Sequence, residues 1–225
     1  MSTRRSFLRD NGLSIVLACC FLLLLGGQTL AGWHVYNEER AERKQIPVSL
    51  GLYLGSGHFA EALFENWESE FLQMGAYVLL TVVLFQRGSS ESKDPDRRDE
   101  KVDEDPEEHR NDPEAPGPVR RGGWRLALYR NSLSIAFGLL FLGSVIGHAL
   151  GGLAMHNEER VAEGEAPYSL GAYVGSSDFW FESLQNWQSE FLAVLSIVLL
   201  SVWFRQYGSP ESKPVHASHT DTGSG

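Results

Sequence analysis

The sequence predicts an all-α integral membrane protein with four transmembrane helices, formed by tandem duplication of a two-helix hairpin. Residues 11–93 match residues 131–213 without a gap, and about 37 of the 83 pairs are identical, which is the self-similarity of a repeated unit. Each copy contains two apolar segments of a length close to that of a bilayer-crossing helix. We expect the four helices near residues 12–33, 67–86, 131–153 and 187–205.

The overall composition masks this membrane character, because the charge is concentrated in one segment. The chain has a formal net charge of -10, and residues 90–119 hold twelve acidic side chains, five basic ones and five prolines. Such a segment is predicted to be a solvated, disordered linker; the alternative is an acidic segment that binds a basic partner. We therefore expect a first repeat (1–89), the linker (90–119), a second repeat (120–213) and a disordered tail (214–225).

The first apolar segment has two interpretations. No charged residue occurs between Leu13 and Trp33, and about 20 such residues cross the hydrocarbon layer. Arg4 and Arg5 also resemble a twin-arginine export signal, with a cleavage site near Ala31. A transmembrane helix is favoured, because the second copy keeps the apolar segment in an internal position where no signal peptide acts.

The only two cysteines, Cys19 and Cys20, are neighbours in this first segment. Adjacent residues in a helix cannot form a relaxed disulfide. The sequence therefore offers no disulfide framework, and we expect both cysteines to be packing residues.

The second apolar segment of each copy is preceded by a polar motif that contains Asn-Trp. Ser56 is a predicted N-cap for a helix that starts near His58 and that lies or tilts at the membrane surface before crossing. The apolar run from Phe71 is only about 15 residues long, so the crossing has to include Trp67. This places Glu70 at the outer edge of the hydrocarbon.

The positive charges predict the orientation. With a cytoplasmic N-terminus, fifteen of the nineteen Lys and Arg residues lie in the cytoplasm, as the positive-inside rule requires. Both termini are then cytoplasmic and the loops of both hairpins face outward. Two helices per copy also give both copies the same orientation, related by an axis along the membrane normal.

A cluster of polar side chains recurs at the outer end of each hairpin, and it is the candidate functional site. Its members are Asn37, Glu38, Glu39, Arg40, Asn66, Trp67, Ser69, Glu70, Asn157, Glu158, Glu159, Arg160, Asn186, Trp187, Ser189 and Glu190. A carboxylate near hydrocarbon needs a partner, and the repeated arginines are the nearest cations. One hypothesis is a structural clamp that closes each hairpin and satisfies the loop backbone. The other is a small transporter or channel subunit, in which Glu70 and Glu190 face each other and bind a proton, a cation or a polar solute.

Histidines and glycines give two further predictions. No histidine recurs 120 residues on, so a duplicated metal site is disfavoured and a single asymmetric one stays open. His148 is either a proton relay or a hydrogen-bonded residue between helices. Gly143, Gly147 and Gly151 form a small-residue ridge that predicts close packing of the third helix against another.

No catalytic, phosphate-binding, zinc-binding or dinucleotide-binding motif occurs in the chain. We therefore expect a non-enzymatic protein without cofactor. The acidity disfavours nucleic acid as a partner. The expected partners are the lipid bilayer and either a second copy or another membrane protein.

Three short motifs, each repeated 120 residues later, are the most specific of the chain. They are Asn37-Glu38-Glu39, Ser49-Leu50-Gly51 and Asn66-Trp67-Glu68-Ser69-Glu70-Phe71. In these motifs the sequence resembles a family of small bacterial integral membrane proteins classed as a domain of unknown function. The resemblance implies a location in the bacterial inner membrane. It implies no catalytic activity.

Overall fold

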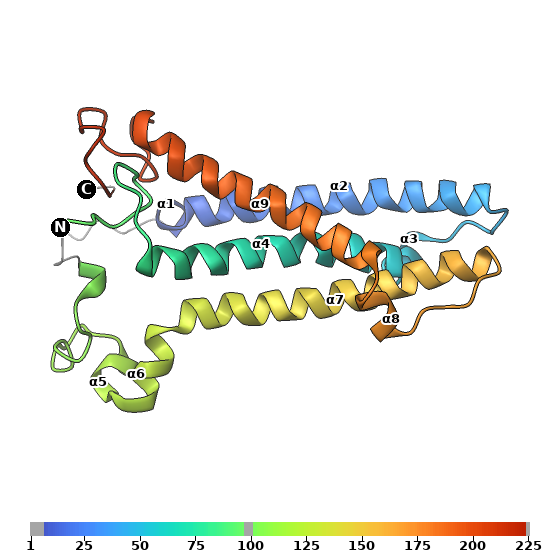
Figure 1. The fold of residues 1–225 in the computed structure, drawn as a ribbon, viewed down its shortest axis with the longest axis horizontal. Helices are drawn as coiled ribbons and strands as arrows, with labels where there is room; N and C mark the ends of the chain where they lie inside the picture. Colours follow the sequence, from blue (N-terminus) through green and yellow to red (C-terminus); the bar gives the residue numbers. More distant parts are fainter. Residues whose placement is uncertain (1–6, 97–100, 224–225) are drawn as a thin grey trace. The chain divides into compact units, whose positions relative to one another are not determined.

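The computed structural model describes residues 7–96 and 101–223, and within them it contains helices and turns but no strand. The predicted all-α class is therefore confirmed. Arg4 and Arg5 of the export-signal alternative lie outside the described residues. The elements in chain order (Figure 1) are α1 (Phe7–Asp10), α2 (Gly12–Glu42), α3 (Leu50–Tyr53), α4 (Gly57–Val83), the 3-10 helix η1 (Lys101–Asp103), α5 (Gly117–Arg121), α6 (Gly123–Arg130), α7 (Ser132–Ala162), α8 (Leu170–Val174) and α9 (Ser177–Trp203).

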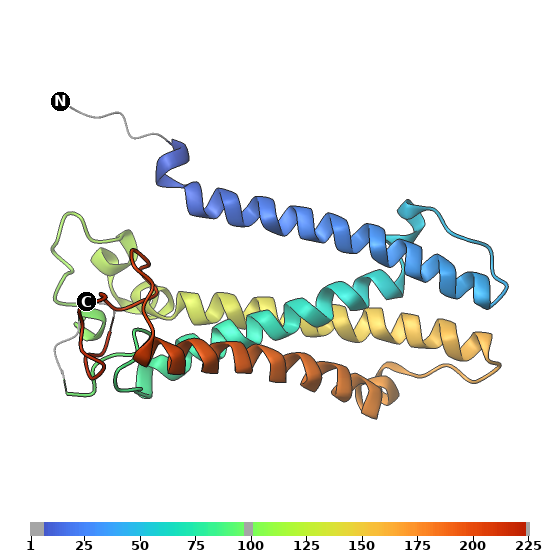
Figure 2. The same ribbon diagram turned by 90° about the horizontal axis from the view of Figure 1, so that it is seen from above.

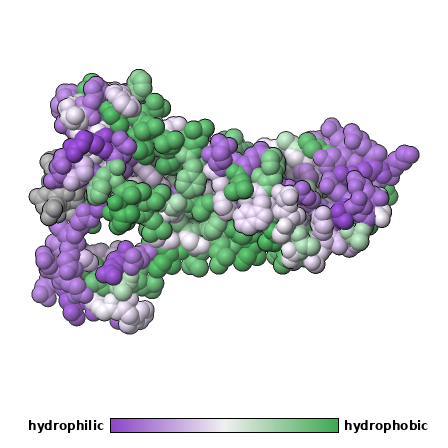
Figure 3. Space-filling model, viewed as in Figure 1, coloured by the Kyte–Doolittle hydropathy of each residue, from purple (hydrophilic) through white to green (hydrophobic). Residues whose placement is uncertain are grey.

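Three described helices, α2, α7 and α9, are long and apolar enough to cross a membrane. In α2 only Tyr36 is buried, and large apolar side chains such as Leu17, Leu23 and Leu30 are exposed. Such exposure would be unfavourable in water and is favourable in lipid. Figure 3 shows apolar residues along the helices and polar residues gathered over the loops that follow α2 and α7.

The count of four membrane-crossing helices is corrected to three on length and composition, because α4 does not qualify. This helix has 27 residues, but its first four turns carry several glutamates. The apolar part, from Phe71 to Val83, rises only about 20 Å, less than the roughly 30 Å of a bilayer core. The end of the first helix also differs from the prediction, since α2 continues to Glu42 and places Asn37 and Arg40 on a helix.

The bounds of the long helices recur at a spacing of 120 residues. α7 begins and ends 120 residues after α2, and α9 does so relative to α4. The predicted cap forms, because the backbone N–H of Phe59 donates to Ser56 Oγ at 3.2 Å and that of Phe179 donates to Ser176 Oγ at 3.3 Å. The tandem duplication itself stays a prediction.

The chain divides into two compact units, which we describe separately. Unit 1 comprises Met1–Phe64 and Gly147–Gly175, and unit 2 comprises Glu65–Ile146 and Ser176–Gly225. Each unit takes residues from both predicted repeats, and the division into two repeats, a linker and a tail stays a prediction. Disorder of the linker also stays a prediction; its described part holds η1, several turns and the start of α5.

Unit 1 has a core of aromatic and polar side chains. Tyr53 and Tyr173 are almost fully buried, and their hydroxyls lie so close to Gly32 and Gly152 that a Cβ at either glycine would collide with them. Burial raises the pKa of Tyr53, so its hydroxyl stays protonated. The loops after α2 and α7 lie at the same end of this unit (Figures 1 and 2).

The glycine ridge of α7 packs closely at two of its three positions. A Cβ at Gly147 would collide with the ring of Phe64, and one at Gly151 would lie 2.6 Å from the backbone nitrogen of Glu61. Nothing lies within 4 Å of a Cβ built at Gly143. Two glycines therefore let α7 and the start of α4 approach closely inside unit 1.

Unit 2 brings α9 against α4 and the first part of α7. The rings of Phe141 and Trp187 are 6.2 Å apart in an edge-to-face arrangement, a favourable aromatic geometry. A Cβ at Gly75 would lie 3.2 Å from Phe137 Cβ. This packing positions the polar residues of α4 and α9.

Candidate functional site

The loop after α2 is held by side chains of α2 itself. Asn37 Nδ2 donates to the Val48 carbonyl at 3.1 Å, and the Val48 N–H donates to Asn37 Oδ1 at 2.7 Å. Trp33 Nε1 donates to the same carbonyl at 2.8 Å, and Arg40 Nε donates to the Ile46 carbonyl at 3.0 Å. Backbone groups that belong to no helix or sheet are thereby satisfied.

The loop after α7 is held in the same way. Asn157 Nδ2 donates to the Tyr168 carbonyl at 3.0 Å, and the Tyr168 N–H donates to Asn157 Oδ1 at 2.6 Å. Arg160 Nε donates to the Ala166 carbonyl at 2.8 Å, and its guanidinium lies 4.0 Å from the centroid of the Tyr168 ring. We call each Asn–Arg pair with its loop backbone a loop clamp.

Both loops begin with a residue in the left-handed region. Gly164 has φ +81° and Lys44, its counterpart, has φ +58°. In both loops the next backbone N–H donates at 2.7 Å to the carbonyl of the clamp arginine. Glycine adopts this conformation without strain, whereas a lysine there has a conformational cost.

Two ion pairs join α7 to the end of α2 and its C-cap residue in unit 1. Arg40 Nη1 lies 2.7 Å from Glu158 Oε1, and Arg43 Nη2 lies 2.7 Å from Glu159 Oε1. The Tyr36 hydroxyl also donates to Glu158 Oε2 at 2.7 Å. The hydrogen bond with Glu159 raises the pKa of the Arg43 guanidinium.

The residues 120 positions away from these partners do not form the same ion pairs among the residues that the structure describes. Arg160 instead pairs with Glu165 in its own loop, at 2.7 Å. Glu38, the counterpart of Glu158, is exposed, and Glu39 is half-buried. Equal residues of the two clamps therefore have different charge partners.

In unit 2, the second Asn-Trp motif, Asn186-Trp187, contacts carboxylates of α4. Asn186 Nδ2 donates to Glu65 Oε1, and Trp187 Nε1 donates to Glu68 Oε1 at 2.9 Å. Glu68 is only 1% exposed. Glu65 and Glu68 were missed because their counterparts are glutamines and the repeat therefore gave no acidic signal.

The predicted pair Glu70 and Glu190 is less enclosed than Glu68. Glu70 is exposed and Glu190 is half-buried. Ser69 is buried and its hydroxyl donates to the Asn66 carbonyl at 2.8 Å. That the two glutamates bind a solute stays a prediction.

The remaining members of the predicted cluster lie near the same helix ends. Trp67 stacks edge-to-face on Phe71, with 6.4 Å between the ring centroids. Asn66 is exposed, as is Ser189, whose hydroxyl donates to the Asn186 carbonyl at 2.8 Å.

A buried group of ionisable side chains lies in unit 1 behind the loops. His148 is fully buried and Glu61 is 6% exposed; their nearest ligand-type atoms lie within 4.8 Å of each other. His156 Nδ1 lies 3.6 Å from Glu61 Oε1. At the spacing of 120 residues, His148 matches Gln28, His156 matches Tyr36 and Glu61 matches Phe181. This group therefore has no equivalent among the matching residues.

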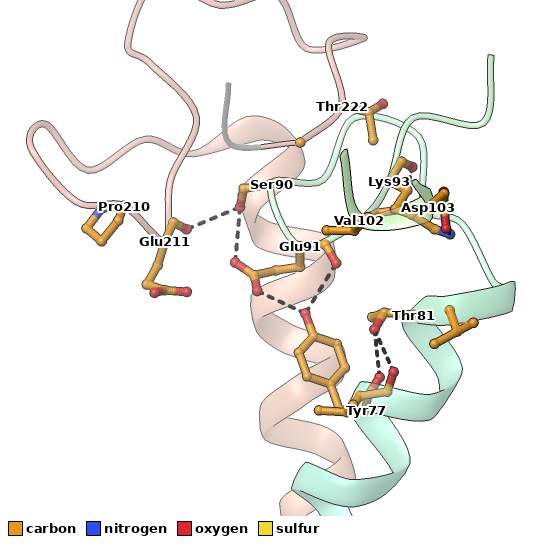
Figure 4. A pocket seen from close by; sticks show the side chains of 14 residues that line it. Tyr77, Thr81, Ser90, Glu91, Lys93, Val102, Asp103, Pro210, Glu211 and Thr222 are labelled. Carbon is orange, nitrogen blue, oxygen red and sulfur yellow. Dashed lines mark hydrogen bonds and ion pairs between the residues drawn. The ribbon is translucent and has the colours of Figure 1, made fainter. Parts of the chain in front are cut away.

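A pocket of about 750 Å³ opens in unit 2, where α4 ends and the segments after α4 and α9 meet. Figure 4 shows Tyr77, Glu91 and Glu211 on one side of it, and Lys93 with Asp103 on the other. The Tyr77 hydroxyl donates to Glu91 Oε2 at 2.9 Å. The sequence marked Glu91 and Glu211 as repeated but did not predict that they line a pocket.

Comparison with known proteins gives a family but no activity. Residues 4–224 match the family model described as a domain of unknown function (DUF6766). No curated protein and no solved structure matches the chain. The expected resemblance to a family of unknown function is confirmed, whereas a bacterial origin stays a prediction.

Proposed function

The chain belongs to the DUF6766 family, a domain of unknown function, and we propose that it is a non-enzymatic membrane protein of structural or interaction type. Its place is the bacterial inner membrane. Its two outward loops form a fixed polar surface beside the lipid, held by the loop clamps. The expected partner of that surface is a second copy or another membrane protein.

The loop clamps carry this proposal. Each asparagine makes two hydrogen bonds to one residue of its loop, and each arginine makes a third to the loop backbone. A side chain used in this way is committed to the structure of its loop. It fixes a loop conformation, which reduces the entropy lost when the loop binds a partner.

α4 does not qualify as a crossing by its length and composition alone; we propose that its polar first turns, packed against α9, extend it to a fourth crossing, which places both termini in the cytoplasm. The contacts of Glu65 and Glu68 with Asn186 and Trp187 support this, because carboxylates near the hydrocarbon then face protein rather than lipid. The distribution of Lys and Arg supports the orientation.

The topology is tested with single cysteines in a Cys19→Ser/Cys20→Ser background. Cysteine at 42 or 163, both exposed, is expected to react with a membrane-impermeant maleimide in intact cells. Cysteine at 107, in the linker, is expected to react only after lysis. Labelling of 42 and 163 from opposite sides would contradict the proposal.

The clamp is tested with Asn37→Asp and Asn157→Asp. Aspartate keeps the acceptor but loses the N–H donor and places a charge beside a carbonyl, so each change is expected to cost about 1–3 kcal/mol. Thermal unfolding of the purified protein and its level in the membrane measure the loss. Asn111→Asp, an exposed linker residue, is the control; equal stability of all three variants would refute the clamp.

The second candidate is a small transporter or channel subunit that uses Glu70 and Glu190. The recurrence of this carboxylate in both copies and the half-buried position of Glu190 favour it. In proteoliposomes, Glu70→Gln with Glu190→Gln would then abolish a pH-dependent flux while leaving thermal stability unchanged. Lower stability with no change in flux would favour the structural role.

A further inference from the structure

The pocket at the end of α4 has an unbalanced charge. Lys93 Nζ lies 2.8 Å and 3.0 Å from the two carboxylate oxygens of Asp103, so this pair is neutral. Glu91 accepts from the Tyr77 hydroxyl at 2.9 Å and from Ser90 Oγ at 3.2 Å, and both donors are uncharged. Two negative charges, those of Glu91 and Glu211, therefore remain.

Neither of these carboxylates has a cationic partner in the part of unit 2 that the structure describes. Ser90 Oγ donates both to Glu91 Oε1 at 3.2 Å and to the Glu211 carbonyl at 3.1 Å, and the side chains of Glu91 and Glu211 line the same pocket (Figure 4). Like charges that share a site repel each other. A cation between them would remove that repulsion.

The two carboxylates are presented by equivalent turns. After α4, the Gln86 N–H donates to Ser92 Oγ at 2.9 Å and Glu91 N–H to Ser89 Oγ at 3.1 Å. After α9, the Gln206 N–H donates to Ser212 Oγ at 3.0 Å and Glu211 N–H to Ser209 Oγ at 3.2 Å. Both carboxylates are therefore held on fixed backbone.

Each turn includes a glycine in the left-handed region, with φ +86° at Gly88 and +82° at Gly208. Other residues adopt this conformation only with strain. The lysines that follow the glutamates are both occupied elsewhere. Lys93 pairs with Asp103, and Lys213 is buried and donates to the carbonyls of Ser218, His219 and Asp221.

The rest of the lining is apolar or hydroxylic. Val78, Val82 and Val102 contribute aliphatic surface, and Thr81 and Thr222 contribute hydroxyls. A volume of about 750 Å³ suits an organic molecule better than a bare metal ion, which needs a compact shell of oxygens. An anion is disfavoured by the charge.

We propose that this pocket binds a linear aliphatic polyamine, whose ammonium groups pair with Glu91 and Glu211 and whose methylene chain lies on the three valines. The Tyr77 hydroxyl and Ser90 position the Glu91 carboxylate through their hydrogen bonds. The acidic linker, which supplies Val102 and Asp103, raises the local concentration of such cations. This site is independent of the loop clamps, which belong to unit 1.

The test is isothermal titration of the full chain, in a non-ionic detergent, with spermidine and with 1,4-diaminobutane. 1,4-Butanediol has the same carbon chain without charge and is the matched ligand control. Glu211→Gln removes one charge without removing a hydrogen bond seen here, and Glu91→Gln keeps an acceptor for Tyr77. Glu107→Gln, an exposed carboxylate of the linker outside the pocket, is the matched protein control.

Saturable binding of both amines, absent for the diol and weakened by about tenfold in Glu211→Gln and in Glu91→Gln, is the expected result. Glu107→Gln is expected to bind as the wild type does. No binding up to millimolar amine would overturn the proposal. Equal weakening in Glu107→Gln would also overturn it, because the linker would then attract amines without a site.

If Glu91→Gln unfolds, Glu211→Gln and the wild type still decide the matter. The affinity of the wild type is also expected to fall as salt rises from low to physiological concentration, since the contacts are between charges. An affinity independent of salt would contradict the proposed pairing.

Discussion

The loops after α2 and α7 are held by the same hydrogen bonds, whereas the buried groups behind them differ. Both loops use an asparagine and an arginine on backbone atoms. Behind the first, the Tyr53 hydroxyl lies 3.3 Å from His58 Nδ1. Behind the second, Tyr173 stacks near His156, with 5.0 Å between the rings, and His156 contacts Glu61.

The comparison separates two kinds of contact. The repeated Asn and Arg side chains bond backbone atoms of their own loops. Contacts between side chains differ, since Arg40 pairs with Glu158 and Arg160 with Glu165. The contacts to backbone therefore support the scaffold, and chemical differences between the two regions are to be sought among the contacts between side chains.

The largest effect is expected where a tyrosine lies over a glycine. Gly152→Ala places a methyl group on the Tyr173 hydroxyl and is expected to lower the free energy of unfolding by about 1–3 kcal/mol. Tyr173→Phe in the same chain should restore part of it, because the hydroxyl oxygen is gone. A Gly152→Ala variant as stable as the wild type in thermal unfolding would contradict this packing.

The next effect is a difference in stability between substitutions of the two repeated lysines, Lys93 and Lys213. Lys213→Met leaves three carbonyls without their donor and is expected to cost about 1–3 kcal/mol. Lys93→Met removes only a partly exposed ion pair, which contributes about 0–1 kcal/mol. Chemical denaturation of both variants measures the difference, and equal losses would refute it.

The Lys213 comparison also has a pH dependence. Burial, with Arg205 nearby, lowers the pKa of Lys213 below 10.5. Between the lowered pKa and 10.5 the unfolded chain binds more protons, so stability should rise with pH across that window. Lys213→Met should lack this rise relative to the wild type.

A smaller effect is expected at the ion pair between α2 and α7. Glu158→Gln removes the charge that faces Arg40 and Tyr36 and should cost about 1 kcal/mol in thermal unfolding, less at high salt. Glu38→Gln changes the counterpart, which is exposed, and is the control. The interpretation would be wrong if both changes had the same effect.

The smallest expected effect is stabilising. Lys44→Gly removes a non-glycine residue from the left-handed region, which relieves strain but adds entropy to the unfolded chain, for a net gain of about 0.5 kcal/mol. Gly164→Lys makes the opposite change in the other loop and should destabilise. Opposite shifts of the unfolding temperature are the expected observation.

The sequence predicted a large part of this fold because periodicity, composition and caps are local properties. The all-α class, three of the four apolar helices and the Ser56 cap were predicted in this way. The end of α2 was placed too early, since the charged residues after Trp33 favoured a loop. Asn37 and Arg40 lie in the continued helix, and their side chains bond the loop backbone from there.

The candidate site itself stays a prediction. Asn37, Arg40, Asn157 and Arg160 were marked by repetition, and their loop contacts agree with the clamp hypothesis. Glu65 and Glu68 were not marked, because a repeat shows only what is equal in both copies. Their contacts with Asn186 and Trp187 join segments more than a hundred residues apart.

The sequence by itself determined the helical, membrane-compatible character of the chain and marked the repeated polar residues near its loops, because hydrophobicity and residue identity are local properties. Only the tertiary structure decided which carboxylates are buried and that Glu91 and Glu211 share one pocket. It also decided that Lys93 pairs with Asp103, whereas Lys213 donates to three backbone carbonyls. Those outcomes depend on distances between segments that are remote in the chain, and such distances follow from packing rather than from residue order.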